Sequence, residues 1–284
     1  MGTDVPGGSV VRHCAVLGSP IAHSLSPALH RAAYAELGLT WTYEAIEVDE
    51  PGLEPFLAGL DASWRGLSLT MPLKRTVMPL LDEADAWARA SGGANTVVLE
   101  GGRLLGYNTD VAGAVRALRE AGVGSAPRAV VLGGGATAAS LLLALSELGC
   151  QHAQLLVRDP DRAAETLAAV DRHGRGPDVR VGRLNDAVGP ADVVVSTIPA
   201  TAQVPDLVSS ALTAPVLFDV VYDPWPTPLA AAASSAGRVL VGGLDLLVHQ
   251  AALQVALMTG REAPLVAMRA AGESALATRT GGGA

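Results

Sequence analysis

The stretch V-V-L-G-G-G-A-T-A-A-S (Val130 to Ser140) decides the fold of this chain. It reads as an apolar strand, a glycine turn and an alanine-rich helix, the order that opens a Rossmann-type nucleotide-binding unit. Glycines in such a turn let the backbone approach a pyrophosphate, whose charge is favoured at the helix N-terminus. Ala138 stands at the third glycine position of the usual G-x-G-x-x-G pattern, so a plain strand–helix turn explains the triplet as well.

The chain that follows alternates short apolar strands with helical patterns. Strands are predicted at residues 129–132, 154–157, 179–182, 193–196 and 216–220, and helices at 137–148 and 160–170. Strands separated by helices predict parallel βαβ units with right-handed crossovers.

The part of the chain before Val130 also mixes strands and helices. Strands are predicted at residues 10–17, 42–48 and 66–69, a hairpin at 96–99 and 103–105, and helices at 27–37, 51–59, 74–81 and 110–121. An apolar helix at 244–259 is predicted to run back to this first unit. We therefore predict a two-domain α/β fold with a cleft between the domains. Residues 1–110 and 243–284 would form a substrate-binding domain, and residues 111–242 a Rossmann-type dinucleotide-binding domain.

Composition narrows the class of protein. With 284 residues, 49% of them hydrophobic, the chain can bury a sizeable core. Its net charge of −8 gives no general attraction to nucleic acid or to an anionic membrane. Neither a signal peptide nor a bilayer-spanning segment is recognisable, so we expect a cytoplasmic protein. Cys14 and Cys150 lie in apolar runs without CxxC spacing, which predicts buried reduced thiols and no metal site.

Three polar loops before Val130 carry side chains suited to chemistry. They are G-S-P-I-A-H-S-L-S-P (Gly18 to Pro27), G-L-S-L-T-M-P-L-K (Gly66 to Lys74) and G-Y-N-T-D (Gly106 to Asp110). Hydroxyls, an amide, one lysine and one carboxylate beside a nucleotide-type loop suggest proton and hydride transfer on a small polyhydroxylated substrate.

Lys74 and Asp110 are the candidate acid/base pair. Lys74 is predicted in the first turn of a helix, where it could donate or accept a proton. Taken singly, each residue has a simpler explanation, since Lys74 could be a solvated lysine and Asp110 a helix cap. Capping explains Ser24 and Ser26 equally well, and a hydrogen bond between packed helices explains Gln250.

The stretch L-L-V-R-D-P-D-R-A (Leu155 to Ala163) ends the second predicted Rossmann strand and bears on the cofactor. An acidic residue at such a strand end binds the ribose hydroxyls of NAD, whereas arginine accepts the 2′-phosphate of NADP. Arg158 and Arg162 favour NADP, although they could also be a solvated pair. Asp159 between them keeps NAD open unless it caps the following helix.

Eight stretches, taken in order, resemble the shikimate dehydrogenase family over about residues 15–258. They are G-S-P-I-A-H-S-L-S-P, S-L-T-M-P-L-K, G-A-N-T-V, G-Y-N-T-D, V-L-G-G-G-A-T-A, V-S-T-I-P, F-D-V-V-Y-D-P-W-P-T-P-L and G-L-D-L-L-V-H-Q. The resemblance implies a substrate-binding domain joined to a Rossmann domain. It also implies reversible NADPH-dependent reduction of 3-dehydroshikimate to shikimate, a step of chorismate biosynthesis.

The resemblance further assigns roles to single residues. Lys74 and Asp110 match the family's catalytic pair. Substrate-binding roles fall on Ser24, Ser26, Ser68, Thr70, Asn95, Thr109, Tyr222 and Gln250. NADP-binding roles fall on Gly133, Gly134, Gly135, Ala136, Thr137, Arg158, Arg162, Thr197, Val220 and Gly243. No metal is implied, and a homodimer is left open.

Two departures from the family pattern keep alternatives open. Ser68 stands where the family commonly has asparagine in V-N-V-T, and Val157 and Asp159 replace the Asn and Thr of N-R-T-x-x-R. A quinate/shikimate or aminoshikimate dehydrogenase that uses NAD is one alternative. A cofactor-sensing regulator on the same fold is the other, and it would need no Lys–Asp pair.

Overall fold

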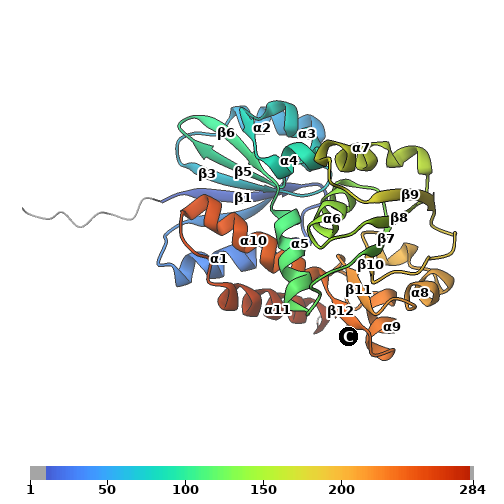
Figure 1. Ribbon diagram of the computed structural model, residues 1–284. Helices are drawn as coiled ribbons and strands as arrows, with labels where there is room; N and C mark the ends of the chain where they lie inside the picture. The colour runs from blue at the N-terminus through green and yellow to red at the C-terminus, as the bar shows by residue number, and fades with distance from the viewer. Residues whose placement is uncertain (1–10, 282–284) are drawn as a thin grey trace, which may run out of the picture.

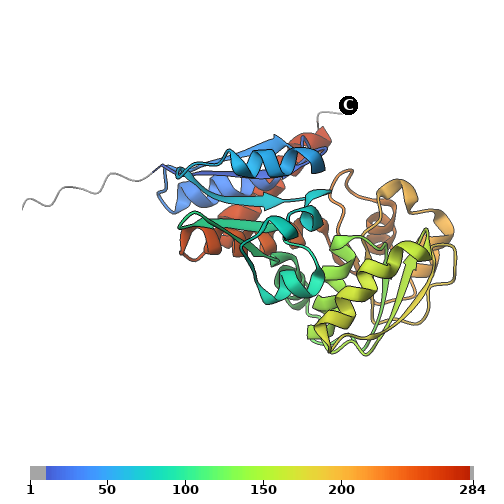
Figure 2. The ribbon, with the colours of Figure 1, turned by 90° about the horizontal axis from the view of Figure 1, so that it is seen from above.

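The computed structural model describes residues 11–281, with the side chains of Arg162 and Thr280 excepted. The signal-peptide prediction concerns residues 1–10, which lie outside the described residues, as do residues 282–284 of the predicted first domain. Two α/β halves lie side by side, each built on a six-stranded sheet (Figure 1). The view from above in Figure 2 separates the same two halves. The predicted two-part α/β fold is confirmed.

The first half holds a mixed sheet with the strand order β2-β1-β3-β5-β6-β4. Its strands are β1 (His13–Gly18), β2 (Thr42–Glu47), β3 (Trp64–Leu69), β4 (Glu83–Ala84), β5 (Thr96–Glu100) and β6 (Arg103–Tyr107). β1 pairs in parallel with β2 and β3, whereas β5 is antiparallel to β3 and forms the predicted hairpin with β6.

Helices cover both faces of this sheet. They are α1 (Ser26–Glu36), α2 (Glu50–Ala58), α3 (Leu73–Thr76), α4 (Ala86–Ser91), α10 (Gly243–Thr259) and α11 (Leu265–Gly281). Cys14 and Val16 of β1 pack against α1, α10 and α11, while Ala15 and Leu17 face α2 and α3. Alternate residues of a strand point to opposite faces, so burial on both faces explains why β1 reads as one unbroken apolar run.

The second half holds a fully parallel sheet with the strand order β12-β11-β10-β7-β8-β9. Its strands are β7 (Arg128–Leu132), β8 (His152–Val157), β9 (Asp178–Arg183), β10 (Val193–Ser196), β11 (Val216–Asp219) and β12 (Val239–Val241). Counted from β7, this is the 3-2-1-4-5-6 order of dinucleotide-binding folds. The glycine turn after β7 therefore lies where the strand order reverses, which is where such folds bind ligands.

Two layers of helices enclose this second sheet. They are α5 (Thr109–Glu120), α6 (Ala136–Glu147) and α7 (Ala164–His173) on one face, and α8 (Pro205–Ala211) and α9 (Pro228–Ser235) on the other. Short 3-10 helices η2 (Pro160–Ala163) and η3 (Ala200–Ala202) complete this half. Among the described helices, none has both the length and the apolar composition needed to cross a bilayer.

Several predicted elements needed correction. The helix predicted at 74–81 stops with α3 at Thr76, and the 3-10 turn η1 (Met78–Leu80) follows. The cause is Pro79, which has no N–H to continue the helical ladder. The helix predicted at 160–170 begins as the 3-10 turn η2 and becomes α-helical only at Ala164. The helices α4, α8, α9 and α11 were not predicted as separate elements.

The helices α5 and α10 pack against each other where the two halves meet (Figure 1). α5 leads from the first sheet into the second, and α10 returns after β12. Gly113 lies at their contact, where a Cβ would come within 2.9 Å of both the backbone N and the Cβ of Gln250. Only glycine allows this approach, and the same contact holds Gln250 in place.

We expect Gly113→Ala to destabilise the protein by about 1–3 kcal/mol, because the added methyl meets helix backbone that cannot move aside. Helix propensity alone would stabilise the alanine variant by about 1 kcal/mol, so a loss of stability would have to come from the close contact of α5 with α10. Gly124→Ala is the matched control, since nothing lies within 4 Å of a Cβ there. Urea unfolding of both variants measures the difference, and equal stability would show that α5 and α10 are not closely packed.

Candidate active site

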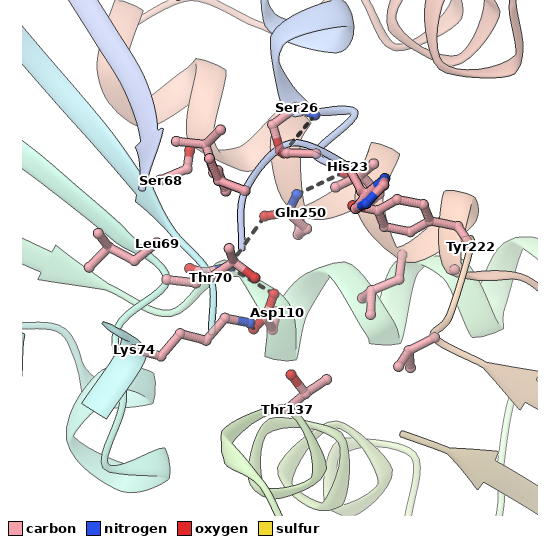
Figure 3. Close-up of a pocket in the computed structure, with 18 of the residues that line it drawn as sticks. His23, Ser26, Ser68, Leu69, Thr70, Lys74, Asp110, Thr137, Tyr222 and Gln250 are labelled. Carbon is pink, nitrogen blue, oxygen red and sulfur yellow. Dashed lines mark hydrogen bonds and ion pairs between the residues drawn. The ribbon is translucent and has the colours of Figure 1, made fainter. Parts of the chain in front are cut away.

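A cavity of about 320 Å³ lies between the two halves (Figure 3). The first half lines it with the ends of β1 and β3 and the loop after β1, and the second half with Thr137 and the loop after β11. The predicted site residues found in its lining are Ser24, Ser26, Ser68, Thr70, Lys74, Asn95, Asp110, Thr137, Val220, Tyr222, Gly243 and Gln250. The sequence motifs thus converge on one place.

The other predicted site residues lie outside this lining. Thr109 is buried behind the wall, hydrogen-bonded to Asn95. The remaining ones, all in the nucleotide-binding half, are Gly133, Gly134, Gly135, Ala136, Arg158, Arg162 and Thr197.

Lys74 and Asp110 form an ion pair on the cavity wall. The distance between Lys74 Nζ and Asp110 Oδ2 is 2.7 Å, and the two side chains are 15% and 6% exposed. Lys74 comes from the second position of α3, and Asp110 from the first turn of α5. Asp110 is therefore not the cap of α5. Asn108 has that role, because its side chain accepts hydrogen bonds from the N–H groups of Asp110 and Val111.

Asn95 orients the carboxylate of this pair. Its Oδ1 accepts the backbone N–H of Thr109 at 2.8 Å, which fixes the orientation of the amide because a backbone N–H can only donate. Asn95 Nδ2 therefore faces the pair and donates to Asp110 Oδ1 at 2.8 Å. With one oxygen held by Lys74 and the other by Asn95, the Asp110 carboxylate has a single orientation.

Gln250 belongs to the same network. Its Oε1 lies 3.3 Å from Asn95 Nδ2, and its Nε2 donates to the Leu247 carbonyl at 2.9 Å. Figure 3 shows Gln250 at the back of the cavity, between the Asp110 side and the Ser26 side. Both explanations offered for Gln250 are compatible with the structure. Gln250 packs on Gly113 where α5 and α10 meet, and it also lines the cavity.

The loop after β1 closes one end of the cavity beside the loop after β11. His23 Nδ1 lies 3.2 Å from Asp223 Oδ2, so the loops of the two halves touch. Arg279 of α11 donates to the His23 carbonyl at 2.8 Å. Tyr222 lines the cavity next to this contact, and burial raises the pKa of its phenol, which keeps it neutral.

Gln254 and Asp223 are lining residues that the sequence analysis did not assign. Gln254 accepts from Ser68 Oγ at 2.8 Å and is 1% exposed. Its spacing of four residues from Gln250 places both on one face of α10, and this spacing was the available signal. Asp223 follows Tyr222 directly, and no pattern in the sequence marks it.

The glycine turn fits a dinucleotide pyrophosphate. Gly133 has a φ of +104°, and a Cβ there would lie 2.3 Å from Thr197 Oγ1. A Cβ at Gly134 would lie 2.9 Å from Val157 Cγ1, whereas Gly135 faces open space. Gly135 caps α6 without a side chain, so first-turn N–H groups of α6 remain available to an anion.

Arg158 is exposed and directly follows β8, at the strand end that bears on the choice of cofactor. Asp159 is the N-cap of η2, and its Oδ1 accepts the N–H of Asp161 at 3.2 Å. The predicted capping role of Asp159 is thereby confirmed. Arg162 lies within η2, but its side chain is outside the described part of the structure.

Thr137 and Gly243 bring the nucleotide-binding half to the ion pair. Thr137 is the second residue of α6 and faces the cavity below Lys74 and Asp110 in Figure 3. A Cβ at Gly243 would lie 2.3 Å from the carbonyl oxygen of Val220, so the start of α10 touches the loop after β11. A cofactor held on the glycine turn would therefore reach the cavity.

Comparison with known proteins agrees with this geometry. Residues 16–97 match the shikimate dehydrogenase substrate binding domain, and residues 243–271 match the shikimate 5'-dehydrogenase C-terminal domain. The shikimate dehydrogenase (NADP(+)) of Moorella thermoacetica is 39% identical over 280 residues, covering 94% of this chain and 95% of the relative.

Solved structures are similar over the whole fold. The crystal structure of Mycobacterium tuberculosis shikimate dehydrogenase superposes with a TM-score of 0.84 at 42% identity, covering 93% of this chain and 99% of that one. Quinate dehydrogenase from Corynebacterium glutamicum in complex with NAD gives 0.83 at 30% identity, with coverage of 93% and 99%. The ordered motifs, the paired sheets and these similarities together show that the chain belongs to the shikimate dehydrogenase family.

Proposed function

We propose that this protein is an NADP-dependent shikimate dehydrogenase, which reversibly reduces 3-dehydroshikimate to shikimate in chorismate biosynthesis. The observation that carries the proposal is the Lys74–Asp110 ion pair of 2.7 Å, on the wall of a cavity that Thr137 of the nucleotide-binding half also lines. A cofactor-sensing regulator would have no use for a buried acid/base pair beside its cofactor.

In this proposal Lys74 handles the proton of the reacting oxygen. NADPH, when bound, supplies the hydride that reduces the ketone carbon. The Lys74 ammonium donates a hydrogen bond to the ketone oxygen and gives it a proton as negative charge develops there. Asp110 holds the Nζ of Lys74 in position, and Asn95 holds Asp110. In the reverse direction neutral Lys74 accepts the hydroxyl proton.

The polar lining suits a small polyhydroxylated acid. Hydroxyls and amides from both ends of the cavity face inward, namely Ser24, Ser26, Ser68, Thr70, Asn95, Tyr222 and Gln250. Each oxygen of a desolvated substrate needs a hydrogen-bond partner, because an unpaired one costs about 1–3 kcal/mol. Thr109 acts from behind this wall, by positioning Asn95.

Arg158 supports NADP as the cofactor. An exposed guanidinium directly after the second Rossmann strand can bind the 2′-phosphate, and Asp159 is engaged in capping η2. The glycine turn from Gly133 to Thr137 would hold the pyrophosphate, with Thr197 beside it. An NAD-dependent quinate/shikimate dehydrogenase is the second candidate, because the C. glutamicum quinate dehydrogenase has the same fold at 30% identity.

We also infer the organisation and the setting of the enzyme. Residues 1–110 and 243–284 would bind the substrate and residues 111–242 the cofactor, a division supported by the two sheets. Cys14 and Cys150 are buried free thiols, which suits the reducing cytoplasm. A homodimer remains a proposal that sedimentation would test.

We expect Lys74→Ala to lower kcat by about 10²–10⁴, the usual scale for losing a positioned acid/base group. Absorbance at 340 nm with shikimate, quinate, NADP and NAD in all four pairings measures the wild type and the variant. Arg103→Ala, which breaks an ion pair on the surface, is the control and should keep the wild-type rate. Near-normal kcat in folded Lys74→Ala would remove Lys74 from the chemistry, and a wild type more active on quinate would favour the second candidate.

We expect Arg158→Ala to raise the KM for NADP far more than the KM for NAD. Each phosphate–guanidinium contact contributes about 1.5–3 kcal/mol, and NAD has no 2′-phosphate. Arg180→Ala, an exposed arginine in the middle of β9, is the matched control. If Arg158→Ala weakened both cofactors equally, or the wild type preferred NAD, the phosphate contact would be refuted.

A further inference from the structure

Ser68 is held between two buried side chains that the proposed mechanism does not use. The Ser68 side chain lies on the cavity wall at the end of β3, and the residue is 3% exposed. Its Oγ lies 2.6 Å from the Tyr43 hydroxyl and 2.8 Å from Gln254 Oε1. Tyr43 comes from β2, which β1 separates from β3 in the sheet, and Gln254 comes from α10.

The amide of Gln254 has only one workable orientation. Its Nε2 lies 3.2 Å from the backbone carbonyl of Asn95 and 3.0 Å from Thr96 Oγ1. A backbone carbonyl can only accept a hydrogen bond, so the nitrogen must face it. Gln254 Oε1 then faces Ser68 as an acceptor, and the single hydrogen of the Ser68 hydroxyl is used in this bond.

His30 confirms the acceptor role of Gln254 Oε1 from the other side. His30 is fully buried, and burial lowers the pKa of its imidazole to about 3, so the ring is neutral with one N–H. His30 Nε2 lies 3.2 Å from Gln254 Oε1, whereas Nδ1 has no partner among the described residues. The hydrogen therefore lies on Nε2 and is donated to Gln254.

Tyr43 uses one of the two lone pairs of Ser68. Burial raises the pKa of the Tyr43 phenol, so it keeps its proton, and the ring stacks on His30 with 3.9 Å between centroids. Because Ser68 has already given its hydrogen to Gln254, the 2.6 Å contact is a donation from Tyr43 to Ser68. One lone pair of Ser68 Oγ is left for the cavity.

We propose that Ser68 selects a ligand hydroxyl, because it can offer the cavity only an acceptor. Gln254 is the positioning residue that imposes this direction, and Tyr43 fills the second acceptor site of Ser68. The inference rests on the proposed function, and it concerns one of the two shikimate hydroxyls that do not react. A site built to pair with a hydroxyl rejects an analogue that lacks the donor.

Two shikimate analogues test the proposal, one with fluorine in place of the 4-hydroxyl and one with fluorine in place of the 5-hydroxyl. Fluorine is close to a hydroxyl in size but cannot donate. We expect wild type to show a kcat/KM at least about 10-fold lower for one analogue than for shikimate. In Ser68→Ala the ratio of kcat/KM for shikimate to kcat/KM for that analogue should fall to below about 3-fold, since no buried acceptor is then left without a hydrogen-bond donor.

Substitutions of Gln254 and Tyr43, which lie behind Ser68, distinguish the direction of the Ser68 hydrogen bond from a simple packing effect. Gln254→Met frees the Ser68 hydrogen, so Ser68 can then donate, and the ratio between shikimate and the analogue should shrink. Tyr43→Phe leaves the Ser68–Gln254 bond intact and should keep the wild-type ratio even if the KM rises. The proposal would be overturned if wild type showed about the same kcat/KM for shikimate and for both analogues. It would also be overturned if the ratio of these values were unchanged in both Ser68→Ala and Gln254→Met. Absence of any shikimate oxidation by wild type would instead refute the proposed function and this inference with it.

Discussion

The carboxylate of Asp110 is the point on which the site depends. The Asp110 side chain is 6% exposed, and a buried charge is tolerated only when it is paired and hydrogen-bonded. Lys74 pairs with one oxygen and Asn95 donates to the other, while the first turn of α5 favours a negative charge. Asp110 therefore holds the lysine that we propose for proton transfer, and it lies on α5, which packs on α6 and α10 between the two sheets.

A chain of directed hydrogen bonds spreads outward from this carboxylate. The N–H of Thr109 orients Asn95, and the carbonyl of Asn95 orients Gln254, which in turn orients Ser68. Backbone groups have fixed donor or acceptor character, so they determine the direction of every side chain bonded to them. The direction of these side chains therefore follows from where the fold places two backbone groups, the N–H of Thr109 at the start of α5 and the carbonyl of Asn95 just before β5.

Much of this could be predicted from the sequence, because the signals were local. Glycines after β7, alternating strands and helices, and the run from Leu244 to Thr259 indicated the Rossmann half and the returning helix. What could not be predicted depends on contacts far apart in the chain. Tyr43 lies in an ordinary strand pattern, and the pairing of β2 with β1 brings it to Ser68. His30 lies in an ordinary helix pattern, and the fold brings it to Gln254, 224 residues away in the chain. Helices as short as α4 and α8 contain too few turns for a periodicity to appear.

The central claim is that the cavity beside Lys74 and Asp110 carries hydride transfer between shikimate and the nicotinamide ring. Oxidation of shikimate labelled with deuterium at the carbon that bears the reacting hydroxyl tests it most directly, with mass spectrometry of the reduced cofactor as the readout. We expect one deuterium in each reduced cofactor molecule formed by the wild type. Reduced cofactor without deuterium, or no reduced cofactor at all, would contradict it.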